Sequence, residues 1–185
     1  VGTKIEHNDY TGVEVQPSAR LSWRIKDGHT FWAAISRAVR TPSRVEEGFV
    51  APFIPLFGNP GVESTNVMAY EGGYRISLSK ALSLDLATFF NKYENQISSN
   101  GTTFGNDVYS EAYGFEATAT WQVEENLKLM ANYTFQDVES HGTASSSNNE
   151  GTSPRNQFNV RAYYDLNDKL AVNTALYWYD NIPSV

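Results

Sequence analysis

Residues 114–136 read GFEATATWQVEENLKLMANYTFQ and alternate apolar with polar side chains on both sides of an acidic pair, Glu124 and Glu125. The apolar positions are Phe115, Ala117, Ala119 and Trp121 before the pair, and Leu127, Leu129, Ala131, Tyr133 and Phe135 after it. Successive side chains of a β-strand point to opposite faces, so a period of two gives each strand one apolar face. Solvated carboxylates are ordinary occupants of a turn. The stretch therefore predicts two antiparallel strands joined by a short turn.

The same alternation recurs along most of the chain. It covers residues 19–25, 29–39, 158–166 and 170–178, and further strands are expected near 67–79 and 82–97. No segment shows a convincing helical period. We therefore expect an all-β fold, an antiparallel meander of about nine strands.

The connections between these strands alternate in length. Short turns are expected at Asp27–Gly28, near Lys80, at Glu124–Glu125 and at Asn167–Asp168, and longer links over about 41–66, 98–107 and 139–153. In a meander, this order puts the short turns at one end and the long links at the other. Outer-membrane β-barrels have this asymmetry, with short periplasmic turns and longer extracellular loops.

Aromatic residues on the apolar face fall into two groups. Trp23, Trp121 and Tyr164 lie three or four residues before a short turn, and Phe90, Phe135, Phe158 and Trp178 lie eight or more residues from one. Two aromatic belts on an apolar face, with a polar opposite face, are typical of a transmembrane barrel with a wet lumen. A soluble antiparallel sheet with one buried face gives the same alternation. The fold class predicted here is part of a transmembrane β-barrel, with the soluble sheet as the alternative.

Charge and composition exclude several classes of function. The 185 residues carry a net charge of -7, and the pI is near 4.9, which argues against nucleic acid as a partner. The chain has no cysteine, so it has no disulfide framework and no thiolate metal site. The N-terminus lacks a signal peptide and the C-terminus stops just after a strand pattern. We therefore expect an internal piece of a longer protein.

Catalytic and metal chemistry find little support in the residues. His7, His29 and His141 are far apart along the chain, and no Ser and acid stand beside any of them as a triad would require. Glu46 and Glu47 are adjacent carboxylates without further ligands, which is a weak metal signal. The glycines form no phosphate-cradling loop. We expect no catalytic residue, no metal site, no cofactor and no enzyme activity.

The segment SRAVRTPS, residues 36–43, ends a strand. Pro42 has no N–H and cannot continue a central ladder. Arg40 carries a guanidinium to the strand end, where carbonyl groups or a carboxylate can satisfy it. We expect both residues to anchor the rim from which the next link leaves, with direct ligand contact as the alternative.

The link that follows contains VEEGFVAPFIPLFGNPG, residues 45–61. Its apolar side chains and prolines predict a semi-rigid aromatic surface, because such content must be covered or used for binding. The possible ligand-facing residues are Arg44, Phe49, Phe53 and Phe57. Packing of this surface against neighbouring loops is the favoured interpretation, and contact with a ligand is the alternative.

Two charged residues four positions apart, Glu71 and Arg75 in YEGGYR, lie on one face of the predicted strand near 67–79. We expect them in a charge network that faces the lumen rather than in a binding site. In the strand over 29–39, Phe31, Ala33 and Ile35 are expected to face lipid, with Trp32 on the opposite face.

Three motifs, in this order, resemble those of the TonB-dependent outer-membrane receptors. SRAVRTPS is similar to the family's strand end with an Arg-x-Pro signature before an extracellular loop. GNPGVESTNVMAYEGGYRISLSKALSLDLATFFNKYENQI, residues 58–97, resembles the family's Asn-Pro…Glu…Tyr-Glu-x-Gly-x-Arg pattern, and residues 111–139 resemble its Gly-x-Glu strand, short turn and Tyr-Thr-aromatic strand. The resemblance runs from about residue 16 to 180. It departs from the pattern at Val62, where the family has Pro before the Glu.

The resemblance implies that residues 1–185 are a single segment of the receptor's β-barrel domain, nearer its C-terminal end, with the plug domain absent. The missing plug would be a further surface against which the link over 45–61 packs. Plugged transporters of this type have about 22 strands. The implied function is a part in energy-coupled uptake of a scarce nutrient, a ferric siderophore or otherwise haem or cobalamin, with this chain contributing barrel wall and extracellular loops. The implied partners are outer-membrane lipid, the ferric siderophore or a similar small ligand, and TonB through the missing N-terminal part. The implied location is the bacterial outer membrane.

A second function class stays open at this point, a soluble β-sandwich or barrel that binds carbohydrate or protein. A piece of barrel also has two unpaired edges and an apolar outer face. We therefore expect the isolated chain to close as a smaller barrel, to pair its edges with another copy, or to fold as two layers.

Overall fold

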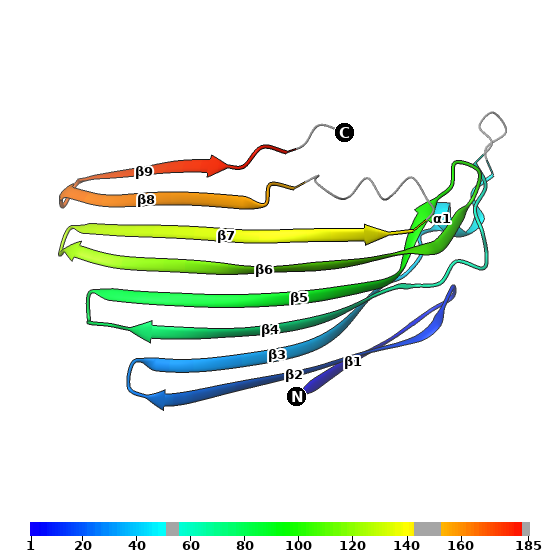
Figure 1. Cartoon of the computed structure of the whole chain (residues 1–185), viewed down its shortest axis with the longest axis horizontal. Coiled ribbons are helices and arrows are strands. Elements are labelled where there is room, and N and C mark those ends of the chain that lie inside the picture. Colours follow the sequence, from blue (N-terminus) through cyan, green and yellow to red (C-terminus); the bar gives the residue numbers. More distant parts are fainter. Residues whose placement is uncertain (51–55, 143–152, 183–185) are drawn as a thin grey trace.

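The computed structural model describes residues 1–50, 56–142 and 153–182, which form one antiparallel sheet and one short helix (Figure 1). The strands are β1 (Gly2–Asn8), β2 (Gly12–Lys26), β3 (His29–Arg40), β4 (Thr65–Ser77), β5 (Leu82–Ser99), β6 (Phe104–Glu124), β7 (Leu127–His141), β8 (Asn156–Asn167) and β9 (Leu170–Tyr179). Their order in the sheet is their order in the chain, so each strand pairs with the next. The prediction of an all-β meander of about nine strands is confirmed.

The four predicted short turns share one end of the sheet, and the predicted long link between β3 and β4 leaves from the other end (Figure 1). The short turns cover residues 27–28, 78–81, 125–126 and 168–169. The β3–β4 link covers residues 41–64. Two short connections, residues 9–11 and 100–103, lie at the same end as this link. The predicted long link over 139–153 lies mostly outside the described residues.

The connection between β5 and β6 differs from the prediction. The expected long link over 98–107 is wrong, because the two strands continue past that point and leave only residues 100–103 between them. Register shifts around Asn95, which has φ 53°, let the pairing continue. Bulges of this kind break the period-two alternation that the sequence prediction relied on. In the turn, Asn100 Oδ1 accepts two backbone N–H bonds of 2.9 Å.

The helix α1 (Arg44–Gly48) was not expected from the sequence, and the expectation of no helix is wrong at this point. Ser43 and Glu46 form a capping box: Glu46 N–H donates to Ser43 Oγ at 3.4 Å, and Ser43 N–H donates to Glu46 Oε2 at 2.7 Å. The helix has five residues, too few for a helical period to show. The cap is therefore the local signal that starts it.

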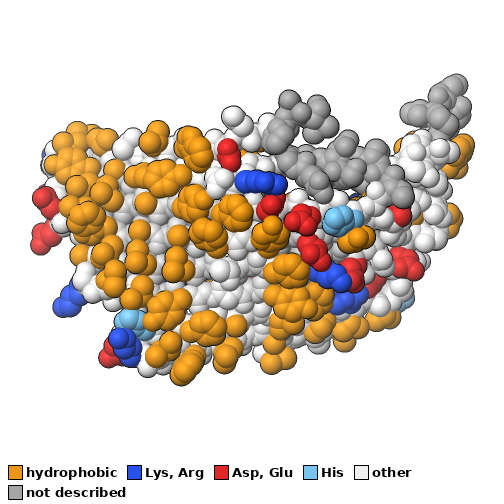
Figure 2. Space-filling view, in the orientation of Figure 1, with side chains coloured by type: hydrophobic (Ala, Val, Ile, Leu, Met, Phe, Trp, Pro, Cys, Tyr) orange, Lys and Arg blue, Asp and Glu red, His pale blue; other side chains and the backbone are white. Residues whose placement is uncertain are grey.

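One face of the sheet is apolar and exposed. Register puts Trp23, Phe31, Tyr74 and Leu86 side by side across four neighbouring strands. Figure 2 shows this face, where hydrophobic side chains spread over the strands and charged side chains flank them at both ends. Among the described residues, the buried hydrophobic side chains are Val62 and Val108 together with Pro42. The sheet thus has no sizeable core, and its apolar face is available to lipid.

The apolar band has the length that a membrane requires. On β5 the side chains on this face are mostly apolar from Leu82 to Phe90, and Lys92 is the next one on the same face. On β7 the same change follows Phe135, at Asp137. These spans match the about 9–11 residues of a transmembrane strand. No helix among the described residues is long and apolar enough to cross a membrane.

The register of β3 agrees with the prediction. Phe31 and Ile35 are 38% and 40% exposed on the apolar face, opposite Tyr74 and Tyr70 on β4. Trp32 points to the polar face. Gly73 on β4 makes room for it, since a Cβ on that glycine would lie 2.5 Å from Trp32 Nε1.

The two edges of the sheet, β1 and β9, do not pair with each other. The described chain is one open layer, so the expectations of a smaller closed barrel and of two layers are wrong. The physical reason is that each strand bonds only its neighbours in the chain, and nine strands do not bring the ends together. Edge pairing with another copy stays a prediction.

Candidate functional site

Three connections meet at the long-link end of the sheet (Figure 1). They are the β1–β2 turn (9–11), the β3–β4 link (41–64) and the β5–β6 turn (100–103), and together we call them the rim. The link reaches the β5–β6 turn, because Phe57 N–H donates to the Thr102 carbonyl at 2.8 Å. Asn59 Nδ2 adds a hydrogen bond of 3.0 Å to the Phe104 carbonyl. The rim is therefore held across strands that are not adjacent.

Arg40, at the end of β3, forms an ion pair with Glu46 of α1. Arg40 Nη2 lies 2.5 Å from Glu46 Oε1, and the two side chains are 56% and 12% exposed. Partial burial raises the pKa of Glu46, but hydrogen bonds from Arg40 and Ser43 outweigh this and lower the pKa below its usual 4.5. The carboxylate partner that the sequence analysis allowed for Arg40 is thus Glu46, six residues along.

The other predicted residues of this segment lie around α1. Pro42 is buried directly after β3 and before the helix cap. Arg44 is exposed in the first position of α1. Phe53, a predicted ligand-facing residue, lies outside the described residues.

Phe49 and Phe57 come together where the link doubles back. Val50 and Phe57 form an antiparallel bridge, and Gly58 N–H donates to the Phe49 carbonyl at 2.6 Å. Phe49 is 38% exposed and Phe57 is 44% exposed. Two aromatic residues predicted from the sequence thus lie on a short paired segment of the rim with partly exposed side chains.

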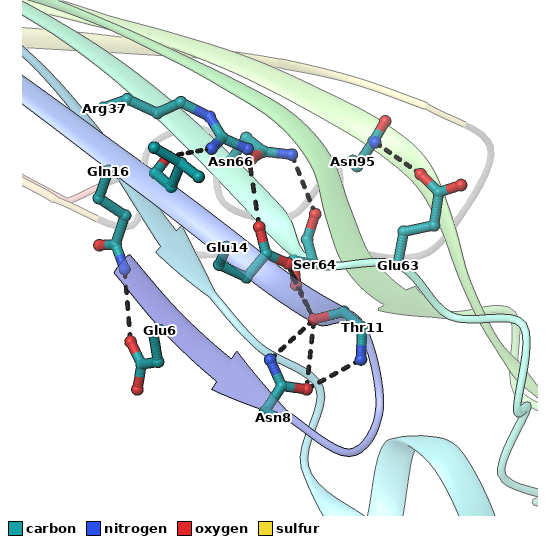
Figure 3. A network of polar contacts seen from close by, with 11 residues as sticks. Glu6, Asn8, Thr11, Glu14, Gln16, Arg37, Glu63, Ser64, Asn66 and Asn95 are labelled. Atoms are coloured by element: carbon teal, nitrogen blue, oxygen red, sulfur yellow. Dashed lines mark hydrogen bonds and ion pairs between the residues drawn. The ribbon is translucent and has the colours of Figure 1, made fainter. Parts of the chain in front are cut away.

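A polar network joins the β1–β2 hairpin to the start of β4 (Figure 3). Glu14 Oε1 accepts hydrogen bonds from Ser64 Oγ at 2.6 Å and from Thr11 Oγ1 at 2.8 Å. Arg37 donates to a backbone carbonyl of β2 and to Asn66 Oδ1, and its Nη2 lies 3.8 Å from Glu14 Oε2. Glu14 and Ser64 are buried, 9% and 5% exposed. Beyond Ser18 and Ser36 the strands β2 and β3 are no longer paired, and we call this stretch the seam. The five residues that bridge it, which we call the seam network, are Thr11, Glu14, Arg37, Ser64 and Asn66.

An open pocket of about 380 Å³ lies beside the seam network. Tyr10 lines it from the hairpin turn, and residues 60–64 line it from the link. The carboxylates of Glu14 and Glu63 also line it. Glu63 is held in turn by Asn95 Nδ2, which donates to Glu63 Oε2 at 2.9 Å. The pocket is thus lined mainly by polar residues beside one aromatic residue, Tyr10.

Glu71 and Arg75 lie on the polar face of β4, away from the rim. Arg75 pairs with Asp85, its neighbour on β5, with Nη2 to Oδ2 at 2.5 Å. Glu71 lies opposite Ala34 and Phe89. The structure therefore joins Arg75 to Asp85 and not to Glu71, and Asp85 was not singled out from the sequence.

In the part of the chain that the structure describes, no group of three His, Cys, Asp or Glu side chains could hold a metal ion. The rim exposes the side chains of Arg44, Phe49 and Phe57.

Glu14, Arg37 and Ser64 were not predicted as functional residues from the sequence. One signal for Arg37 is present in the sequence, since a charged residue follows Phe31, Ala33 and Ile35 in the apolar register of the strand. Glu14 and Ser64 are separated by 50 residues. No local pattern links them, because their contact depends on how the link folds back onto the hairpin.

Comparison with known proteins gives one family match. The family model described as TonB dependent receptor-like, beta-barrel, matches residues 1–183. The iron-regulated outer membrane virulence protein of Vibrio cholerae serotype O1 is 23% identical over an alignment of 194 positions, which covers 91% of this chain and 29% of that protein. The chain thus spans less than a third of the length of this curated relative.

Solved structures with the same fold come from Pseudomonas aeruginosa. A mutant of the ferric enterobactin receptor PfeA in complex with enterobactin matches with a TM-score of 0.77 and 22% identity, over 96% of this chain and 30% of that chain. The siderophore receptor PirA matches with a TM-score of 0.74 and 17% identity, over 95% of this chain and 33% of that chain. At these identities the likeness establishes the fold.

Proposed function

The chain belongs to the TonB-dependent receptor β-barrel family, and we propose that it is part of an outer-membrane receptor that takes up a ferric siderophore. This family consists of transporters and not of enzymes. Residues 1–185 form a single segment of the barrel domain in this proposal. They contribute barrel wall and extracellular rim to the whole receptor.

The observation that carries the proposal is the division of the sheet into two zones. An apolar band, such as that from Leu82 to Phe90 on β5, supports contact with outer-membrane lipid. The rim with its exposed aromatic side chains lies beyond the band at the long-link end, which is the extracellular end in barrels of this kind. A ligand from outside meets the rim first.

The individual residues have the following proposed roles. Arg40 and Pro42 anchor the point where the link leaves β3, supported by the ion pair with Glu46. Arg44, Phe49, Phe53 and Phe57 face the ligand. Arg75 forms a charge pair with Asp85 on the lumen face, and Glu71 lies on the same face of β4 without joining that pair.

Iron is the favoured cargo because the relatives point to it. The curated relative is named as iron-regulated, and the structures with the same fold include receptors named for ferric enterobactin and siderophores. Haem and cobalamin are the other cargo classes of the proposal. Energy coupling through TonB belongs to the whole receptor.

The soluble binding module is disfavoured by the exposed apolar face. Trp23, Leu86 and Trp121 are 60%, 49% and 48% exposed in a one-layer sheet. A soluble protein would cover such a face or aggregate.

Uptake of radioactive iron by the strain that encodes this chain tests the proposal. Deleting the gene, with other siderophore receptors removed, should abolish uptake from at least one ferric siderophore and stop growth under iron limitation. Returning the gene should restore both, and a Phe49→Ala, Phe57→Ala double variant should raise the half-saturating siderophore concentration.

Haem and cobalamin serve as the comparison arms of the same experiment. If deletion leaves all ferric siderophore uptake intact but abolishes uptake of haem or cobalamin, the cargo assignment is wrong while the receptor assignment stands. If none of the three is affected, the uptake function itself is refuted.

A further inference from the structure

The ladder between β2 and β3 stops before either strand ends. Their last paired residues toward the long-link end are Ser18 and Ser36. Beyond this point β2 pairs only with β1, up to Asn8 and Gly12, and β3 pairs only with β4. The first hairpin, residues 2–18, therefore parts from the rest of the sheet, and in Figure 1 its tip lies apart from the ends of β3–β7. This gap between β2 and β3 is the seam.

Arg37 spans the seam with its side chain. It comes from β3 and donates to the Val15 carbonyl on β2 and to Asn66 Oδ1 on β4 (Figure 3). Its Nη2 also lies 3.8 Å from Glu14 Oε2, and its side chain is 30% exposed. A guanidinium has five donors in a fixed fork, so it can bind groups on two strands at once.

Glu14 makes the second attachment across the seam. Its side chain is 11% exposed, and it accepts hydrogen bonds from Thr11 in the hairpin turn and Ser64 in the link. Ser64 Oγ and Thr11 Oγ1 are also 3.1 Å apart. The tip of the first hairpin is thus attached to the β3–β4 link by hydroxyl groups that surround the buried carboxylate of Glu14.

This attachment differs physically from a backbone ladder. A strand ladder can lose its backbone hydrogen bonds one at a time. A buried carboxylate that loses its arginine partner is left with an uncompensated charge, which is strongly destabilising. Burial of such a group is unfavourable unless it is paired and hydrogen-bonded. The closed arrangement therefore depends on the pairing of this carboxylate, and an open arrangement would place both charges in water.

The pocket beside the seam has one wall on each side of it, so a ligand in the pocket would favour the closed arrangement. One wall belongs to the hairpin, through Tyr10, and the other to the link, through residues 60–64. Opening the seam separates the two walls. A ligand that contacts both walls would bind the closed arrangement more tightly than the open one. It would shift the balance between the two arrangements by the difference between these two affinities.

We propose that Glu14 and Arg37 are positioning residues that lock the first hairpin against the β3–β4 link and hold the rim closed around the ligand. The ligand part of this inference rests on the proposed function, in which a ferric siderophore binds at the rim. The lock itself does not depend on the identity of the ligand.

Amide hydrogen exchange of the complete receptor in detergent tests the lock without a ligand. In Glu14→Gln and Arg37→Gln variants, exchange of residues 9–17 and 62–66 should be at least about tenfold faster, while the β6–β7 ladder should keep its rate. Arg75→Gln is the matched control, because it removes an arginine ion pair at the other end of the sheet. Unchanged exchange in both seam variants would overturn the lock.

Siderophore uptake tests the coupling. Both seam variants should raise the half-saturating concentration of the ferric siderophore about tenfold and leave the maximal rate unchanged, because the transport step follows binding. A merely structural defect would lower the maximal rate through loss of receptor. Faster exchange with an unchanged half-saturating concentration would overturn the coupling.

A disulfide can replace the lock, since the chain has no cysteine of its own. Thr11→Cys with Ser64→Cys puts two thiols where the hydroxyl oxygens are 3.1 Å apart. In the Arg37→Gln background, oxidation should return exchange and half-saturation to near the wild-type values, and reduction should reverse this. A cross-linked receptor that still binds weakly would count against the proposal. If the wild-type receptor takes up no ferric siderophore, the proposed function fails while the exchange result still decides the lock.

Discussion

Arg40 and Glu46 form an ion pair of 2.5 Å across the point where β3 ends and α1 begins. The same carboxylate accepts the N–H of Ser43 at 2.7 Å through its other oxygen. One side chain thus closes the cap of α1 and binds the last residue of the strand. The direction in which the β3–β4 link leaves the barrel wall depends on this residue.

Removing the cap should loosen α1 without unfolding the sheet. Ser43→Ala deletes the hydroxyl that accepts the Glu46 N–H and should cost about 1 kcal/mol of local stability. Hydrogen exchange of the α1 amides measures this. Arg44→Ala, an exposed change in the same helix, is the control and should leave the exchange unchanged. Equal effects of the two variants would show that the cap does not hold the helix.

The rim should loosen in acid. The pKa of Glu46 in the folded chain lies below its usual 4.5, so its contribution is complete above that value and is lost as pH falls through the lowered pKa. Exchange of the α1 amides, corrected for the intrinsic pH dependence, should therefore rise only below about pH 4.5. Glu46→Gln should be loose already at pH 7 and show no such step. A step of the same size in that variant would assign the titration to another group.

A charged side chain on the apolar face, at mid-membrane depth, should destabilise the receptor. Leu86 lies in the middle of the apolar band of β5 and is 49% exposed. Leu86→Arg should destabilise the complete receptor in lipid vesicles by about 2–4 kcal/mol. Ala87→Arg, at nearly the same depth on the polar face of the same strand, should cost much less. Urea unfolding from vesicles measures both, and similar costs on the two faces would contradict the assignment of the lipid side.

Gly73 should tolerate no side chain, whereas its neighbour should. A Cβ on Gly73 would lie 2.5 Å from Trp32 Nε1 and 2.6 Å from the Leu86 carbonyl oxygen. Gly73→Ala should therefore cost about 1–3 kcal/mol. Gly72→Ala is the matched control, because its Cβ would meet only the Trp32 carbonyl oxygen, at 3.7 Å. The same unfolding measurement decides between them, and a neutral Gly73→Ala would mean that Trp32 does not pack there.

Local periodicity alone determined the larger part of the fold. The alternation in residues 114–136 predicted β6, β7 and their turn, because the side-chain period of a strand is a property of the backbone itself. The same signal assigned Phe31 and Ile35 to the apolar face. The alternation of short and long connections separated the two ends of the sheet, since a meander returns to the same end at every second turn.

Only the tertiary structure decided the features that depend on distant partners. The hairpin of β1 and β2, the short β5–β6 turn and α1 depend on bulges, caps and pairing that leave little periodic trace. Arg75 binds Asp85 because the β4–β5 register puts them opposite each other. Glu14 meets Ser64 only because the link folds back onto the first hairpin. A period-two pattern determines the face of the sheet on which a side chain lies. Its partner depends on strand register and on the path of the long link, which are properties of the assembled sheet.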